Sequence, residues 1–217
     1  MKTDSQLQQD VMAELKWEPA VHAAQIGVEV KDGVVTLAGE VGSFGEKWNA
    51  ERAAQRVNGV QALTVELVVK LSEFGKRTDA DIARSAETAL GWSTSLPADA
   101  VKVLVEGGWL TLSGDVEWQY QRQNAFDSVR YIMGVTGVSN QIGIKPSLSA
   151  TVVKSDIEAA IKRRAAADAK TISVDVKGAD VTLTGTVHSW AERELATRSA
   201  WSSVGVKNVV DKMNIVF

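Results

Sequence analysis

The chain has 217 residues, no cysteine and a formal net charge of −3 at pH 7. The lack of cysteine excludes disulfides and thiolate chemistry, and the slightly acidic balance opposes generic nucleic-acid binding. No apolar run approaches the roughly 20 residues of a membrane span, so we expect no transmembrane segment. The polar start, "MKTDSQLQQDVM", is not a secretory signal. We therefore expect a cytoplasmic protein, or a periplasmic one if an export signal has been removed.

One unit recurs three times along the chain. The stretches "DGVVTLAGEV" (32–41), "GGWLTLSGDV" (107–116) and "GADVTLTGTV" (178–187) share a glycine at Gly39, Gly114 and Gly185, called here the strand glycines. A second glycine follows 20 residues later, at Gly59, Gly134 and Gly205, called here the helix-end glycines. This register predicts three repeats, 1–73, 74–150 and 151–217. Units this small bury only about 60% of their chain surface, so we expect the repeats to pack against one another or a second copy.

Within a repeat, the first predicted element is a helix, because Leu7, Val11 and Leu15 recur every four residues. Alternating apolar residues at 26–30 then predict a strand, and "KDG" predicts the turn of a hairpin. The quoted stretch is its second strand, with the strand glycine facing inward. We attribute that glycine to close approach of a helix.

The second predicted helix has small inner residues, which match a strand glycine beneath it. These residues are Ala50 and Ala54, Ala125 and Val129, and Ala196 and Ala200. The helix-end glycine and the valine after it end this helix, and a last strand completes the unit. The predicted fold class is α+β: three tandem αββαβ repeats, each a small three-stranded sheet with two helices on one face.

The pattern "GVVTLxGxV", a helix, "GV" and a short strand is similar to the bacterial BON domain, over nearly the whole chain. The resemblance depends on the strand glycines and the helix-end glycines. It is weaker in the first repeat, whose last strand has Leu63 and Glu66 where the family usually shows "VxN". The resemblance implies the αββαβ fold, no catalysis, and a role at phospholipid surfaces during envelope or osmotic stress.

No catalytic or metal-binding constellation accompanies this pattern. His22 and His188 occupy non-equivalent places in their repeats, and neither has a second histidine or a cysteine nearby. Zinc sites need about four clustered ligands, and no nucleophile or phosphate-loop motif occurs. We therefore expect no enzyme, no catalytic residue, no metal and no cofactor.

Seven tryptophans are unusual beside two tyrosines. Trp17 and Trp92, at the end of the first helix, are assigned to the core. The others of interest stand where sister repeats have polar residues, or near the entrance of the second helix, and they are a possible contact surface: Trp48, Trp118, Trp190 and Trp201. Three alternatives remain for them: burial between repeats, contact with a partner or second copy, and contact with a lipid surface.

Charge is uneven along the chain. The third repeat has 10 basic and 8 acidic residues, and "KRR" (Lys162, Arg163, Arg164) lies on its first helix. This run is either a solvated helix face or a patch for an anionic surface. The leading hypothesis is a non-enzymatic binding or structural module linked to stress, which engages anionic phospholipid or an envelope component. The alternative is a cytoplasmic sensor of a small solute or ion held between repeats by backbone carbonyls. Hard cations take oxygen ligands of this kind, which leave little signature in the sequence.

Overall fold

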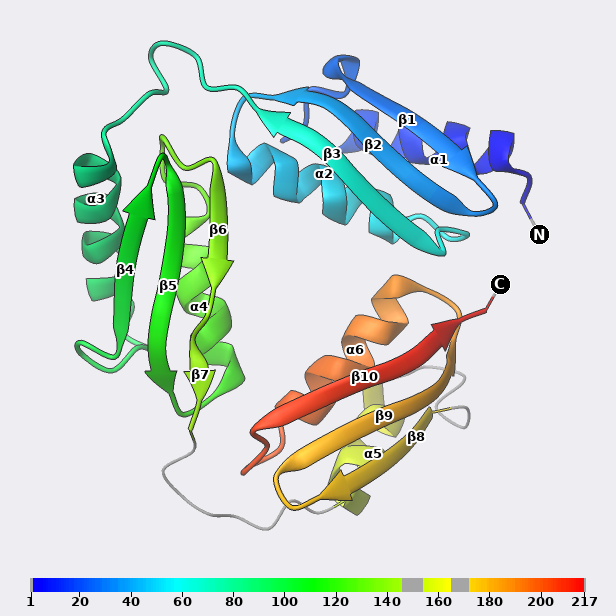
Figure 1. Cartoon of the computed structure of the whole chain (residues 1–217). Helices are drawn as coiled ribbons and strands as arrows, with labels where there is room; N and C mark the ends of the chain where they lie inside the picture. The colour runs from blue at the N-terminus through cyan, green and yellow to red at the C-terminus, as the bar shows by residue number, and fades with distance from the viewer. Residues whose placement is uncertain (1, 146–153, 165–171, 217) are drawn as a thin grey trace. The chain divides into compact units, whose positions relative to one another are not determined.

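A computed structural model of the chain describes residues 2–145, 154–164 and 172–216 (Figure 1). In this part of the chain the order helix, strand, strand, helix, strand recurs three times, with the helices of each repeat on one face of its sheet. This confirms the predicted fold class. The first two repeats form one compact unit, residues 2–116 and 120–143, and the third belongs to a second unit, residues 117–119 and 144–217.

The elements occupy equivalent positions in the three repeats. The first repeat has α1 (Asp4–Trp17), η1 (Ala23–Gln25, a 3-10 turn), β1 (Ile26–Lys31), β2 (Val34–Val41), α2 (Phe44–Arg56) and β3 (Ala62–Val69). The second has α3 (Asp79–Gly91), β4 (Val101–Glu106), β5 (Trp109–Val116), α4 (Gln119–Val129), β6 (Gly137–Asn140) and β7 (Gly143–Ile144). The third has α5 (Lys154–Arg164), β8 (Ile172–Lys177), β9 (Asp180–Val187), α6 (Trp190–Trp201) and β10 (Asn208–Ile215).

The middle strand of each sheet pairs antiparallel with the strand before it and parallel with the strand after it. A parallel partner requires a crossover, which the second helix supplies. The hairpin register is the same in all three repeats: the strand glycine always pairs with the first residue of the preceding strand. These pairs are Ile26 with Gly39, Val101 with Gly114, and Ile172 with Gly185.

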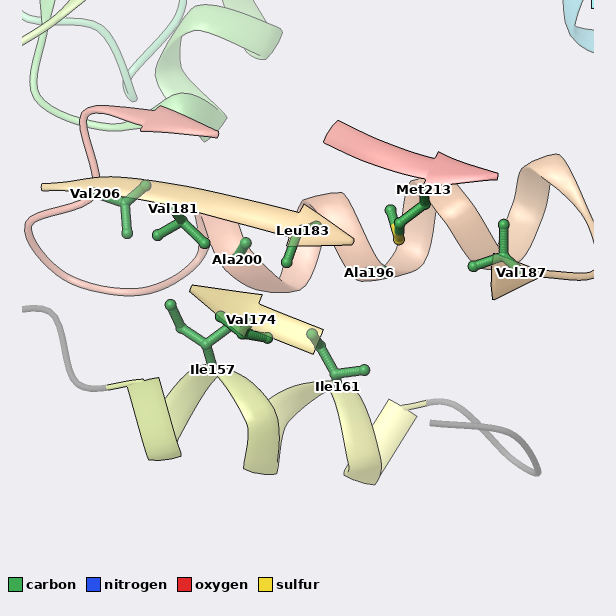
Figure 2. Close-up of a cluster of buried hydrophobic side chains, with 10 residues drawn as sticks. All are labelled: Ile157, Ile161, Val174, Val181, Leu183, Val187, Ala196, Ala200, Val206 and Met213. Carbon is green, nitrogen blue, oxygen red and sulfur yellow. The ribbon is translucent and has the colours of Figure 1, made fainter. Parts of the chain in front are cut away.

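The core of each repeat lies between the sheet and its two helices. Along β2, Val35, Leu37 and Val41 are buried, while Thr36, Ala38 and Glu40, which alternate with them, are on the opposite face. The small inner positions predicted on the second helices are all fully buried, as expected for helices that pack close to a sheet. Figure 2 shows this core in the third repeat, where Ile157 and Ile161 of α5 gather with the inward residues of β9 and with two alanines of α6.

The strand glycines have a different cause from the one predicted. A Cβ atom added to Gly39 would lie 2.1 Å from the backbone carbonyl oxygen of Gln25, and one on Gly114 would lie 2.1 Å from that of Ala100. No atom of an α-helix is among the nearest neighbours of either position. Both residues also have positive φ angles, +135° and +121°, which disfavour any side chain. Close approach of a helix is therefore wrong as the explanation: the glycine accommodates the backbone that enters the first strand.

The helix-end glycines lie in the loop three to five residues beyond the second helix, not at its cap. Their φ angles are +111° at Gly59, +94° at Gly134 and +83° at Gly205. A Cβ on Gly134 would lie 2.8 Å from the Cβ of Arg77 and 3.0 Å from Ile82 Cδ1. These glycines therefore let the loop turn and pass close to the start of the first helix.

An aspartate at the start of the first helix holds the hairpin turn in two repeats. Asp4 Oδ2 accepts from the amide of Asp32 at 2.8 Å, and its Oδ1 accepts from the amide of Gly33 at 3.1 Å. Asp79 accepts hydrogen bonds from the amides of Gly107 and Gly108 in the same way, both at 2.8 Å. The first helix is thus fixed to the hairpin by a carboxylate that accepts both turn amides.

Candidate binding surfaces

Glu46 is the buried polar centre of the first repeat. The hydroxyl of Ser43 caps helix α2, and Glu46, three residues on, turns its carboxylate back toward the loop before the helix. It accepts hydrogen bonds from the amides of Gly42 and His22, both at 2.7 Å, and lies 2.8 Å from His22 Nδ1. Burial alone would raise the pKa of this carboxyl, but the two amides and the His22 ring outweigh it and lower the pKa.

The same helix position ties a loop to the helix in the other repeats. Gln121 Nε2 donates to the carbonyl of Ser95 at 2.9 Å, and Glu192 accepts from the amide of His188 at 2.7 Å. The two histidines are thus non-equivalent in sequence yet both lie beside equivalent glutamates. Their side chains are mainly exposed, and the glutamates are already engaged by backbone amides. We interpret these pairs as supports for loops.

A second polar link joins the second helix to the last strand. Lys47 Nζ donates to the carbonyl of Leu67 at 2.9 Å, and Arg193 Nε donates to Asp211 Oδ2 at 2.7 Å. In the second repeat Asn140 Nδ2 donates to the carbonyl of Arg122 at 3.1 Å.

Across the ranges 2–145, 154–164 and 172–216, no group of three His, Cys, Asp or Glu residues is arranged to hold a metal ion.

Trp48 lies where the first repeat contacts the second. The guanidinium of Arg130 stands 3.9 Å from the centroid of the Trp48 ring. Beside it, Phe44 meets Phe126 edge to face, with ring centroids 6.3 Å apart, and packs against the core of the second repeat. These contacts join the first half of α2 to the end of α4 within one compact unit.

The other three predicted contact tryptophans are partly buried. Trp190 has the guanidinium of Arg193 5.2 Å from its ring, and Trp201 packs against the core of the third repeat. Trp118 precedes α4 and is likewise partly exposed. A partner that would cover these three residues stays a prediction.

Trp17 and Trp92 are the most exposed tryptophans of the described residues, and their assignment to the core is wrong. Each side chain is 82% exposed, and each follows the last buried residue of its helix by two positions. Two residues of α-helix rotate by about 200°, so both indoles point away from the buried stripe. This helical phase was the sequence signal that could have identified them. A shallow groove beside Trp17 is lined by Asp10, Ala13, Glu14 and Val57.

The predicted basic patch lies at the end of α5. Arg163 is exposed, and the backbones of Lys162 and Arg164 are helical, while the side chains of these two lie outside the described part. Among the described residues, no helix is both long and apolar enough to cross a membrane.

Comparison with known proteins identifies the family. The BON domain matches three times, at residues 3–70, 78–146 and 149–216. The chain belongs to the BON domain family. Osmotically-inducible protein Y of Escherichia coli (strain K12) is 30% identical over 146 residues, which cover 65% of this BON protein and 73% of the relative.

Two solved structures resemble the BON chain more distantly. They are CdsD, a structural protein of the type III secretion system of Chlamydia trachomatis, and its C-terminal domain; each is 12% identical. The first has a TM-score of 0.25 and covers 96% of this chain and 91% of its own; the second has 0.26 and covers 100% of both.

Proposed function

We propose that this BON protein is a non-catalytic module of the osmotic stress response that binds anionic phospholipid surfaces. The observation that carries the proposal is the exposure of Trp17 and Trp92 at equivalent helix ends in two repeats. The relative named for osmotic induction supports the link to osmotic stress. A phospholipid partner favours the envelope, and so the periplasmic alternative, as the place of action.

Exposed indoles suit the boundary between water and lipid. An indole has a large apolar body and one N–H donor, so tryptophan gathers where one end of a side chain is apolar and the other is wet. Each such ring buries about 150–250 Å², worth ~25 cal/mol per Å². Met12 and Phe74, 52% and 91% exposed, add apolar surface in the same compact unit.

Basic residues supply attraction to an anionic surface. Lys16 precedes Trp17 in the last turn of α1, and Arg163 is exposed on α5. A basic residue near an anionic bilayer contributes about 1 kcal/mol, less when salt screens it. The acidic residues of the groove beside Trp17 are already paired, Asp10 with Lys2 at 2.7 Å and Glu14 with Arg56 at 2.9 Å. They therefore oppose this attraction only weakly.

Vesicle flotation tests the proposal. The full chain should float with phosphatidylglycerol vesicles at low salt, float less with phosphatidylcholine vesicles, and lose most binding in the double variant Trp17→Ser/Trp92→Ser. Trp109→Ser is the matched control, because Trp109 is 52% exposed but lies on the sheet face away from the helices. Absence of flotation with every composition, or equal loss in the control, would contradict the proposal and favour a protein component of the envelope.

A further inference from the structure

The last strands β3, β6 and β10 lie at the edges of their sheets, each with the middle strand as its neighbour on one side (Figure 1). An edge strand presents a row of N–H and C=O groups on its open side, and these groups can pair with another strand. Proteins limit such pairing with short edge strands and with charged side chains. The three repeats differ in how far their last strands are protected.

In the second and third repeats, a side chain of the last strand occupies an amide of the open edge. Asn140 Oδ1 accepts a hydrogen bond from the Ile142 amide at 3.2 Å, and Asp211 Oδ1 accepts one from the Met213 amide at 3.0 Å. Successive amides of a strand point to opposite sides. In both repeats an amide at an odd spacing from the occupied one donates to the middle strand, so the occupied amides point to the open edge.

The first repeat has an apolar residue at this position. Val65, Asn140 and Asp211 are equivalent, since all three pair with equivalent leucines of the middle strands, and a valine side chain accepts no hydrogen bond. The Leu67 amide, two residues on, points to the open edge, because the Lys70 amide, at an odd spacing from it, donates to β2 at 2.8 Å. Within the described residues the Leu67 amide has no acceptor. The edge amide that is occupied in two repeats is therefore open in the first.

β3 also lacks the other protections of an edge strand. It runs for eight residues with Glu66 as its one charged residue, whereas β6 has four residues and β10 carries an adjacent aspartate and lysine. The opposite edge strands, β1, β4 and β8, have six residues with two charged residues each. On β3, Val68 is 62% exposed on the face away from the helices, and three apolar residues of the inward face are only partly buried: Leu63, Val65 and Val69. β3 is thus the least protected edge of the three described sheets.

We propose that the open edge of β3 is a self-association surface, which pairs antiparallel with the same edge of a second copy of this chain about a two-fold axis at Val68. The Leu67 amide then donates to the Val69 carbonyl of the other copy, whose Val69 amide donates to the Leu67 carbonyl, and the axis repeats both bonds. That carbonyl also accepts from Lys47 Nζ at 2.9 Å, and its two lone pairs accommodate both donors. A two-fold contact through the same edge of both copies closes as a dimer.

Charge favours this register and a second copy as the occupant. Opposite charges directly across antiparallel strands stabilise the pairing, and like charges destabilise it. An axis at Glu66 would place two glutamates opposite each other, whereas the axis at Val68 places Glu66 of each copy opposite Lys70 of the other. Lys70 already pairs with Glu40 at 2.9 Å, but both side chains are more than half exposed, and such a pair contributes little. The Lys70 ammonium has three donors and can serve both carboxylates.

Sedimentation velocity of the full chain tests the dimer. A contact along one strand edge is a small interface, so we expect dimers to form between about 10 µM and about 1 mM protein. Val65→Asn supplies the side chain of the second repeat, and Val68→Lys sets two like charges at the axis; each should raise the dimer dissociation constant about tenfold or more. Val68 is exposed, so its variant tests the edge even where Val65→Asn disturbs the fold. Leu104→Lys, the same kind of change at a residue 56% exposed on edge strand β4, should leave the constant unchanged.

A charge exchange tests the register. Glu66→Lys alone and Lys70→Glu alone each place like charges opposite one another and should weaken the dimer, whereas the double variant Glu66→Lys/Lys70→Glu should restore it. Hydrogen exchange gives the local readout, because the Leu67 and Val69 amides should exchange more slowly as the protein concentration rises. A chain that stays monomeric up to about 1 mM would overturn the proposal and leave the edge to an extended segment of another protein. Equal weakening by Leu104→Lys and Val68→Lys, or no recovery in the double variant, would overturn the pairing.

Discussion

The guanidinium of Arg130 stacks on the Trp48 ring at 3.9 Å, and this pair joins two repeats that are each too small to be comfortably stable. The residues equivalent to Trp48 in the sister repeats, Gln123 and Glu194, are polar. The contact is therefore specific to this pair of repeats. Its partner Arg130, the residue after α4, pairs with Asp127 of that helix and lies 4.8 Å from the centroid of the Tyr131 ring.

Breaking this pair should weaken the coupling between the first two repeats. We expect a double-mutant cycle of Trp48→Ala and Arg130→Ala to give a coupling free energy of about 0.5–2 kcal/mol, the range for cation–π pairs. Urea unfolding of the full chain measures it. Arg84→Ala removes an exposed arginine that pairs with Asp81 along its own helix, and should cost little. Strictly additive single variants would contradict the coupling.

The strand glycines give a sharp test of why they are glycine. Because a Cβ on Gly114 would meet a backbone oxygen at 2.1 Å, Gly114→Ala should already cost about 3 kcal/mol or more. Gly91→Ala is the control, since nothing lies within 4 Å of a Cβ there and the residue is helical; it should be neutral or stabilise by up to about 1 kcal/mol. If Gly114→Ala cost little stability and Gly114→Val cost much, close packing of a helix would instead be the cause.

The fold was predictable because each repeat obeys simple periodicities. Alternation in the strands and the four-residue spacing in the first helix placed Val35, Leu37 and Val41, and Leu7, Val11 and Leu15, in the core. Three copies in register removed the ambiguity that one short segment would leave. The cause of the strand glycines was not predictable, because it depends on the path of the backbone before the first strand.

The candidate surfaces were harder to predict, because sequence spacing does not say what covers a side chain. Trp48 is partly covered by a residue 82 positions away, a contact that no local pattern encodes. Trp17 and Trp92 lie close in sequence to the buried stripe of their helices, but helical phase turns both indoles away from it.

Glu46 should make stability depend on pH. Its pKa in the folded state is lowered below the ordinary value of 4.5, so its contribution is fully present above that value and is lost as pH falls through the folded pKa. Glu46→Gln keeps the shape but removes the charge, and should cost about 1–2 kcal/mol at pH 7. That difference should shrink as the pH falls below 4.5. Urea unfolding across this range, with exposed Glu29→Gln as the control, measures it; a difference that does not change with pH would contradict the assignment.

The carboxylate of Asp79 should stabilise the second repeat by holding its turn. Asp79→Ala leaves the amides of Gly107 and Gly108 to solvent and should cost about 1–2 kcal/mol. Asp79→Asn keeps one acceptor oxygen and should cost less. Glu87→Ala on the exposed face of the same helix is the control. Hydrogen exchange gives the local readout, because the Gly107 and Gly108 amides should lose protection in the alanine variant while the middle of β5 keeps it. Unchanged protection at both glycines would mean that the turn is held by its own geometry and that the carboxylate is incidental.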